Sequence, residues 1–198
     1  MIEAAIGFVG VIVGALMTWL QAIWSENKKR KETRNYIAIL IIFILDRFIQ
    51  GCVDVVSDSG FPDKDGRLVP QFSTPNIDFE SLKADWKVFP NDLIYEILDL
   101  PNKIETADHT ISSVVEFVAG PPDYEEFYEA RQIEYSNLGI IAHKIATKLR
   151  SQNNLPSRDY ENWDPIEFLK KKNQEIKQNR KKRQEQQEEL MKKLKKDA

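Results

Sequence analysis

The apolar residues of this chain gather near its N-terminus in two runs, which a basic segment separates. The first run covers residues 4–24 and contains no charge. At about 1.5 Å per helical residue, it is long enough to cross a hydrocarbon core of about 30 Å. Trp19 and Trp24 lie near its C-terminal end, where aromatic side chains favour the membrane interface. We therefore predict a transmembrane helix within residues 1–25.

The charges around this run predict its orientation. Residues 28–31 are four consecutive Lys or Arg residues and Arg34 follows them, whereas the other side carries only the amino group and Glu3. The positive-inside rule then predicts a single-pass protein of the cell (inner) membrane, with its N-terminus outside and its C-terminus cytoplasmic. A cleaved secretory signal is disfavoured because no basic segment precedes the run and no small-x-small cleavage site follows it.

Small residues recur on one face of the predicted membrane helix. Gly10, Gly14 and Thr18 are spaced by four, and Gly7 lies near the same stripe. Such a stripe lets two backbones approach closely, and close packing drives helix association in lipid. We expect this face to contact a second copy of the chain or a partner helix.

The second apolar run, residues 36–45, is too short to span a membrane and ends at Asp46 and Arg47. Extending it through lipid would cost roughly 2.5–3.5 kcal/mol for each charge. We predict that one helix continues from the membrane to about residue 56 and forms the central core helix of a domain, shared in an oligomer. Cys52, the only cysteine, should be buried in it. A hairpin in which residues 36–56 enter the bilayer is the alternative.

In the rest of the chain's body, the sequence predicts an irregular segment followed by a pair of helices. Residues 57–90 are turn-rich and suggest a hairpin near Asp65 and Gly66, followed by a short helix that carries Phe79 and Trp86. Residues 91–150 predict an antiparallel helical hairpin that turns at Gly120. Its first seam is Leu93, Ile97, Leu100, Ile104, Ala107, Ile111, Val114 and Val118, and its second is Tyr128, Tyr135, Leu138, Ala142, Ile145 and Leu149. Pro101 should kink or divide the first helix.

We predict a linker over residues 151–164. A charged helix is predicted over residues 165–198, and it starts at an Asp164 N-cap. Apolar residues are absent from 177–189, so no coiled-coil heptad is sustained. The cluster Arg180, Lys181, Lys182 and Arg183 could bind an anionic membrane surface. The predicted fold is therefore all-α: a membrane helix, a three- or four-helix cytoplasmic bundle and a charged C-terminal helix.

Charge is segregated between body and tail. Residues 60–164 contain 10 Lys/Arg and 19 Asp/Glu, a net charge of −9, and residues 165–198 contain 12 and 6, a net charge of +6. An acidic body makes nucleic acid an unlikely partner. The acidic residues of 123–134 are interpreted as a solvated face at a helix start.

No pattern of residues indicates catalysis. No nucleophile is paired with a base, no phosphate-binding loop is present, and His109 and His143 should lie too far apart to share a metal. We expect no cofactor and no enzyme activity. The sequence favours a membrane-anchored protein that oligomerises and recruits or senses a partner at the cytoplasmic membrane face. The alternative is a membrane-disrupting effector that inserts residues 36–56.

Overall fold

The computed structural model describes residues 2–117, 125–161 and 163–196. Within these residues the long elements are all helical: α1 (Ile2–Ser57), α2 (Asn91–Phe117), α3 (Glu125–Gln152) and α4 (Pro165–Lys196). The minor elements are two short strands and one 3-10 turn. The predicted all-α fold class is confirmed.

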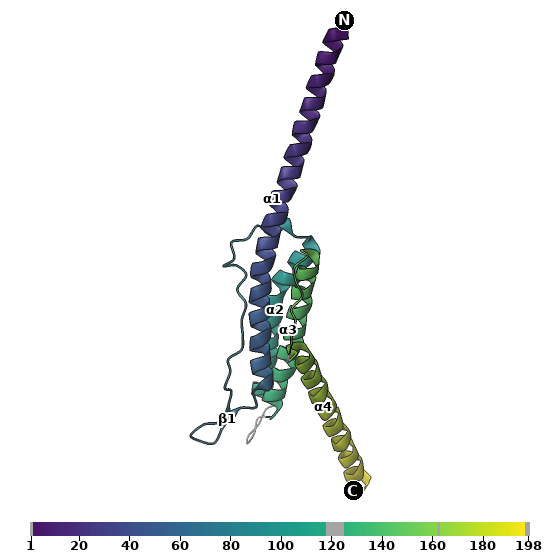
Figure 1. Ribbon diagram of the computed structural model, residues 1–198. Coiled ribbons are helices and arrows are strands. Elements are labelled where there is room, and N and C mark those ends of the chain that lie inside the picture. Colours follow the sequence, from purple (N-terminus) through teal and green to yellow (C-terminus); the bar gives the residue numbers. More distant parts are fainter. Residues whose placement is uncertain (1, 118–124, 162, 197–198) are drawn as a thin grey trace.

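Helix α1 is one continuous helix of 56 residues, as the sequence predicted. Its first half projects from one end of the molecule, and its second half packs into the bundle (Figure 1). Between Leu16 and Ser57 it contains a stretch long and apolar enough to cross a membrane, and half of that stretch is buried within the bundle. The basic segment between the two halves consists largely of good helix formers, so the helix has no reason to break there.

The central helix of the bundle is α3, which packs against each of the other long helices. The prediction that residues 36–56 form the central helix was therefore wrong. The chain directions explain this arrangement, because α1, α2 and α4 all run the same way and α3 runs antiparallel to them (Figure 1). Short connections then join α2 to α3 and α3 to α4, while the link between α1 and α2 must be long.

That link, residues 58–90, runs back along α1 (Figure 1). The predicted hairpin is present: β1 (Phe61–Pro62) pairs antiparallel with β2 (Leu68–Val69). Asp63 organises its turn, because the side-chain Oδ1 accepts hydrogen bonds from the backbone N–H groups of Asp65 and Arg67. Further along, the chain packs so closely on α1 that a Cβ at Gly51 would lie 2.7 Å from Pro75 Cβ.

The predicted short helix around Phe79 and Trp86 was largely wrong. The structure has only the 3-10 helix η1 (Trp86–Val88) in this region. The apolar side chains are still buried, including Phe79 at 3% exposure. An extended chain covers about 3.3 Å per residue against 1.5 Å in a helix, which suits a segment that must return along the length of α1.

Helices α2 and α3 form the predicted antiparallel pair, with the predicted seams facing the core. Pro101 lies inside α2 and does not divide it. The Tyr135 hydroxyl donates a hydrogen bond to Asp108 Oδ1 over 2.7 Å and so joins α3 to α2. The predicted turn at Gly120 and the seam position Val118 lie outside the described residues.

Helix α4 begins at the predicted cap: Asp164 Oδ1 accepts a hydrogen bond from the N–H of Ile166 over 2.7 Å. Its first half is docked, with Ile166, Leu169 and Ile176 buried. A Cβ at Gly139 would lie 2.6 Å from Leu169 Cδ1, so the absence of a side chain there lets α4 approach α3. The later apolar residues Leu190, Met191 and Leu194 are more than half exposed.

Candidate interaction site on the first helix

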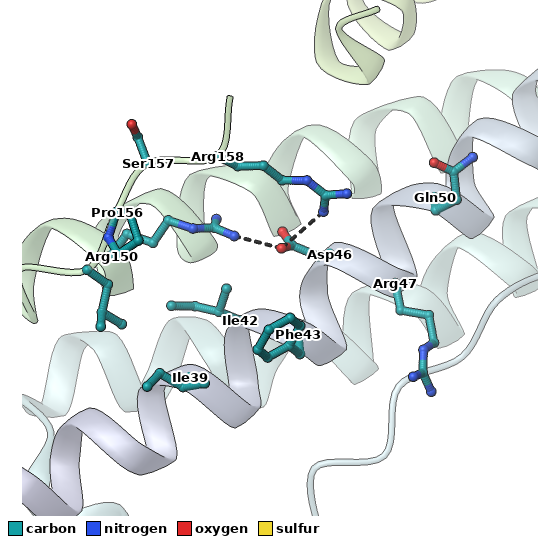
Figure 2. A pocket seen from close by; sticks show the side chains of 11 residues that line it. Ile39, Ile42, Phe43, Asp46, Arg47, Gln50, Arg150, Pro156, Ser157 and Arg158 are labelled. Carbon is teal, nitrogen blue, oxygen red and sulfur yellow. Dashed lines mark hydrogen bonds and ion pairs between the residues drawn. The ribbon is translucent and has the colours of Figure 1, made fainter. Parts of the chain in front are cut away.

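A groove of about 740 Å³ with a mainly apolar lining lies between α1 and the segment after α3. The α1 side contributes Ile39, Ile42 and Phe43, and Figure 2 shows them along one side of the helix. Phe43 is 67% exposed. The opposite wall is formed by residues 155–158. The groove therefore combines an apolar floor with an open side.

A charged cluster closes one end of this groove. Asp46 Oδ2 lies 2.6 Å from Arg150 Nη2 and 3.0 Å from Arg158 Nη1 (Figure 2). The Asp46 and Arg150 side chains are each 12% exposed, whereas Arg158 is 43% exposed. Burial strengthens this electrostatic interaction because water screens it less. Asp46 is thus held in a structural ion pair, whereas the neighbouring Arg47 is exposed and lines the groove.

The wall of the groove is positioned by the end of α3. The Leu155 N–H donates to the carbonyl of Arg150 over 2.9 Å, and Asn154 adopts a left-handed φ of 52°. Arg34 Nε donates to Asn153 Oδ1 over 3.0 Å and so ties this turn to α1. Asn is one of the few residues that tolerate such a φ. The turn therefore holds the segment after α3 beside α1.

One acceptor in the cluster is unused. Asp46 Oδ1 is buried and has no hydrogen-bond partner among the described residues. A buried acceptor without a donor costs about 1–3 kcal/mol, so a donor brought by a bound molecule or a water would be stabilised there. The arrangement can bind an apolar side chain next to a polar group. It pairs no nucleophile with a base.

The predicted association residues lie on the projecting half of α1, away from this groove. At Gly14, an added Cβ would meet no atom within 4 Å, so the surface there is open. Thr18 Oγ1 donates to the Gly14 carbonyl over 2.9 Å, which satisfies the hydroxyl within the helix. Gly10 is helical, and its surroundings lie outside the described residues.

The four predicted anionic-surface residues do not share one face. Arg180 Nε lies 2.9 Å from Glu129 Oε2, and Arg183 contacts both Glu129 and Glu125. Lys181 instead faces Glu185 on its own helix over 3.8 Å, and Lys182 is exposed. Two of the four cations thus dock α4 on α3, and two point to solvent.

Glu129 corrects the interpretation of the acidic segment as a wholly solvated face. This residue is only 8% exposed and accepts hydrogen bonds from both arginines of α4. Helical spacing alone could not reveal this, because the α4 arginines that bury it lie about 50 residues further along the chain.

The sequence interpretation also missed a buried ion pair near the N-terminal end of α3. Arg131 Nη1 lies 3.2 Å from Asp58 Oδ2, with side chains 4% and 0% exposed. Asp58 also accepts hydrogen bonds from the backbone N–H groups of Gly60, Gln71 and Phe72. The available signal was Arg131 itself, a charge that interrupts the apolar register of α3. This cluster fastens the hairpin loop to the bundle.

Metal and thiol chemistry find no support in the described part of the chain. No group of three His, Cys, Asp or Glu residues there could hold a metal ion. Cys52 is fully buried, as predicted, and burial raises the pKa of its thiol well above its ordinary value of 9.0. His143 lies 3.4 Å from Thr147, and His109 is exposed beside Glu105.

No protein-family model matches this sequence, and neither a curated protein nor a solved structure is significantly similar to it. The fold itself defines the class: a helical bundle with one long apolar helix at its N-terminal end.

Proposed function

We propose that this protein is a non-enzymatic, membrane-anchored helical protein that self-associates and recruits or senses a partner at the cytoplasmic face. The observation that carries the proposal is the projecting half of α1. Its large apolar side chains are 38% to 68% exposed: Leu16, Met17, Trp19, Leu20, Ile23 and Trp24. A helix that is apolar on all sides is unfavourable in water and stable in lipid.

The body of the bundle supports the cytoplasmic part of the proposal. Ile37, Ile41 and Leu45 of the second apolar run are at most 5% exposed, and they pack in the core. A membrane-disrupting protein that inserts residues 36–56 would have to pull these side chains out of the bundle. We therefore favour a single span, residues 4–24, over the inserting alternative.

The far end of α4 supports the recruitment part. It lies at the end of the molecule opposite to the N-terminus of α1 (Figure 1). With α1 anchored in a membrane, this end would extend into the cytoplasm. The exposed apolar residues Leu190, Met191 and Leu194 lie there, among lysines. Such a surface is suited to a protein partner rather than to the membrane that holds α1.

Site-directed labelling in cells tests the anchor and its orientation. The native Cys52 is buried and should stay silent, so a single cysteine introduced at exposed Ser157 or Lys182 would report the position of the body. A membrane-impermeant maleimide should label these cysteines in inverted vesicles and not in intact cells. Labelling from outside intact cells would contradict the orientation. Release of the protein from membranes by an alkaline wash would contradict the anchor itself.

A further inference from the structure

One face of α1 stays uncovered within the bundle. Ten consecutive apolar residues surround the helix, but the bundle packs against only one side. Tyr36 and Phe43 remain 64% and 67% exposed, and Ile39 between them is 37% exposed. We call these three residues the α1 face, and two of them, Ile39 and Phe43, line the groove closed by Asp46 (Figure 2). Adjacent exposed apolar side chains of this size mark interaction surfaces.

The α1 face is in register with the small-residue stripe of the predicted span. Counting 29 residues forward leads from Gly10 to Ile39 and from Gly14 to Phe43. At 3.6 residues per turn, 29 residues make about eight full turns, with about 20° left over. Because α1 is unbroken from Ile2 to Ser57, the stripe and the face point to the same side of the molecule.

We infer that a second copy of this chain docks on the α1 face, giving a parallel dimer whose two-fold axis runs along α1. The inference rests on the proposed function, because two copies anchored in one membrane with the same orientation must run parallel. Each copy then presents the same stripe and the same face to the axis. A self-complementary surface of this kind is what a two-fold interface requires.

The groove explains how the bundles meet below the membrane. Two helices that cross near Gly10 and Gly14 diverge along their length. Residues 155–158 stand beside the α1 face and fill part of the space that opens between them. Phe43 of one copy can enter the groove of the other, where Ile42 and Leu155 supply apolar contacts.

The area of the face shows why the membrane helices must contribute. A buried aromatic side chain covers about 150–250 Å², and roughly two-thirds of this is available at Tyr36 and Phe43. Four such side chains in a dimer would bury about 400–700 Å², below the roughly 1,200 Å² of a stable interface. The α1 face therefore adds specificity to an association that begins in the bilayer.

Cross-linking of the full chain in native membranes with a flexible bis-maleimide tests this dimer. Phe43→Cys is the reporter, and Tyr95→Cys is the matched control, since Tyr95 is an equally exposed aromatic residue on α2. The reagent should give a covalent dimer with Phe43→Cys, little with Tyr95→Cys and none with the wild-type chain, whose Cys52 is buried. Equal cross-linking of the two variants would overturn the inference.

The mass of the purified full chain separates this inference from the proposed function. Phe43→Glu should weaken dimerisation by about tenfold or more, the effect of losing one well-buried contact, while Tyr95→Glu should leave it unchanged. Both substitutions are on the surface, and an unchanged helical signal would confirm folding. A monomeric wild-type chain would refute self-association altogether. A dimer that Phe43→Glu leaves intact would refute the α1 face alone, and a complex with a different protein through Phe43 would identify another occupant.

Discussion

At the scale of single residues, the strongest polar constraint is the Asp58 and Arg131 ion pair. Arg131 also donates to the Phe72 carbonyl over 2.7 Å, so one guanidinium contacts both ends of the hairpin loop. A buried charge without its partner is far less stable than the pair. The pair therefore fixes one conformation of the loop against α3.

Removing either partner should destabilise the protein. Asp58→Ala or Arg131→Ala is expected to lower the free energy of unfolding by about 3–5 kcal/mol, because each leaves a buried charge unpaired. Denaturant titration of the detergent-solubilised chain would measure this. Asp65→Ala, at an exposed position in the same loop, is the control. If the two losses add in the double variant, the residues do not act as a pair.

The same site predicts a pH dependence. Burial alone would raise the pKa of Asp58, but hydrogen bonds from Gly60, Phe72, Gln71 and Arg131 outweigh it and lower the pKa below its ordinary value of 3.8. The folded state thus binds a proton less readily than the unfolded state. The stabilisation from Asp58 is full above 3.8 and is lost as the pH falls through the lower folded value. The free energies of unfolding of wild type and Asp58→Asn should therefore approach each other as the pH falls. A difference between them that stays constant with pH would contradict this prediction.

Gly139 is the residue on which close helix packing depends. An added Cβ would lie 3.1 Å from Cys52 Cβ and 2.6 Å from Leu169 Cδ1. Gly139→Val should lower the free energy of unfolding by about 1–3 kcal/mol through overpacking. Gly139→Ala should cost less, because the helix propensity of Ala offsets part of the strain. If Gly139→Val and Gly139→Ala lower the unfolding temperature equally, close packing does not depend on the space at this position.

At the scale of elements, α4 is held by two kinds of contact. Its first half buries apolar side chains, and Asn173 Nδ2 donates to Ser136 Oγ over 2.6 Å. Beyond Ile176, the described contacts to α3 are ionic and involve Arg180 and Arg183. The second half of the helix should therefore open more readily than the first.

Two double variants with the same change of charge test this division. Arg180→Gln with Arg183→Gln should remove about 1–2 kcal/mol of docking, because the arginines remain partly exposed, and should speed amide exchange after Ile176 roughly five- to thirtyfold. Lys181→Gln with Lys182→Gln should leave exchange unchanged. If the two variants instead lose binding to anionic vesicles equally, the four residues act as one surface, as the sequence first suggested.

At the scale of the whole molecule, the packing of three parallel helices around one antiparallel helix sets the geometry. The long return segment between α1 and α2 follows from it, and so do the opposite positions of the N-terminal half of α1 and the far end of α4 (Figure 1). An anchored chain would hold its bundle close to the membrane and extend α4 away from it.

Self-association through the membrane helix has its own test. Gly10→Leu with Gly14→Leu should block close approach of two helices while keeping the run apolar, and it should reduce the oligomer to a smaller species by mass. Leu16→Ile, nearby on the same helix, is the control. An unchanged mass would show that the small-residue stripe is not an interface.

The sequence by itself determined the long helices, their apolar seams, the hairpin around Asp65 and Gly66 and the cap at Asp164. These features depend on residues a few positions apart, and a local pattern records them directly. It also indicated that α1 runs unbroken from the first apolar run into the second, because the segment between them is rich in good helix formers.

Only the tertiary structure decided which helix is central, which side of α1 is covered and which charges are paired. Glu129 meets Arg180, Asp58 meets Arg131 and Asp46 meets Arg150 across 51 to 104 residues of chain. No local spacing encodes such contacts, because they follow from the order in which antiparallel and parallel helices pack. The same packing leaves Tyr36 and Phe43 uncovered.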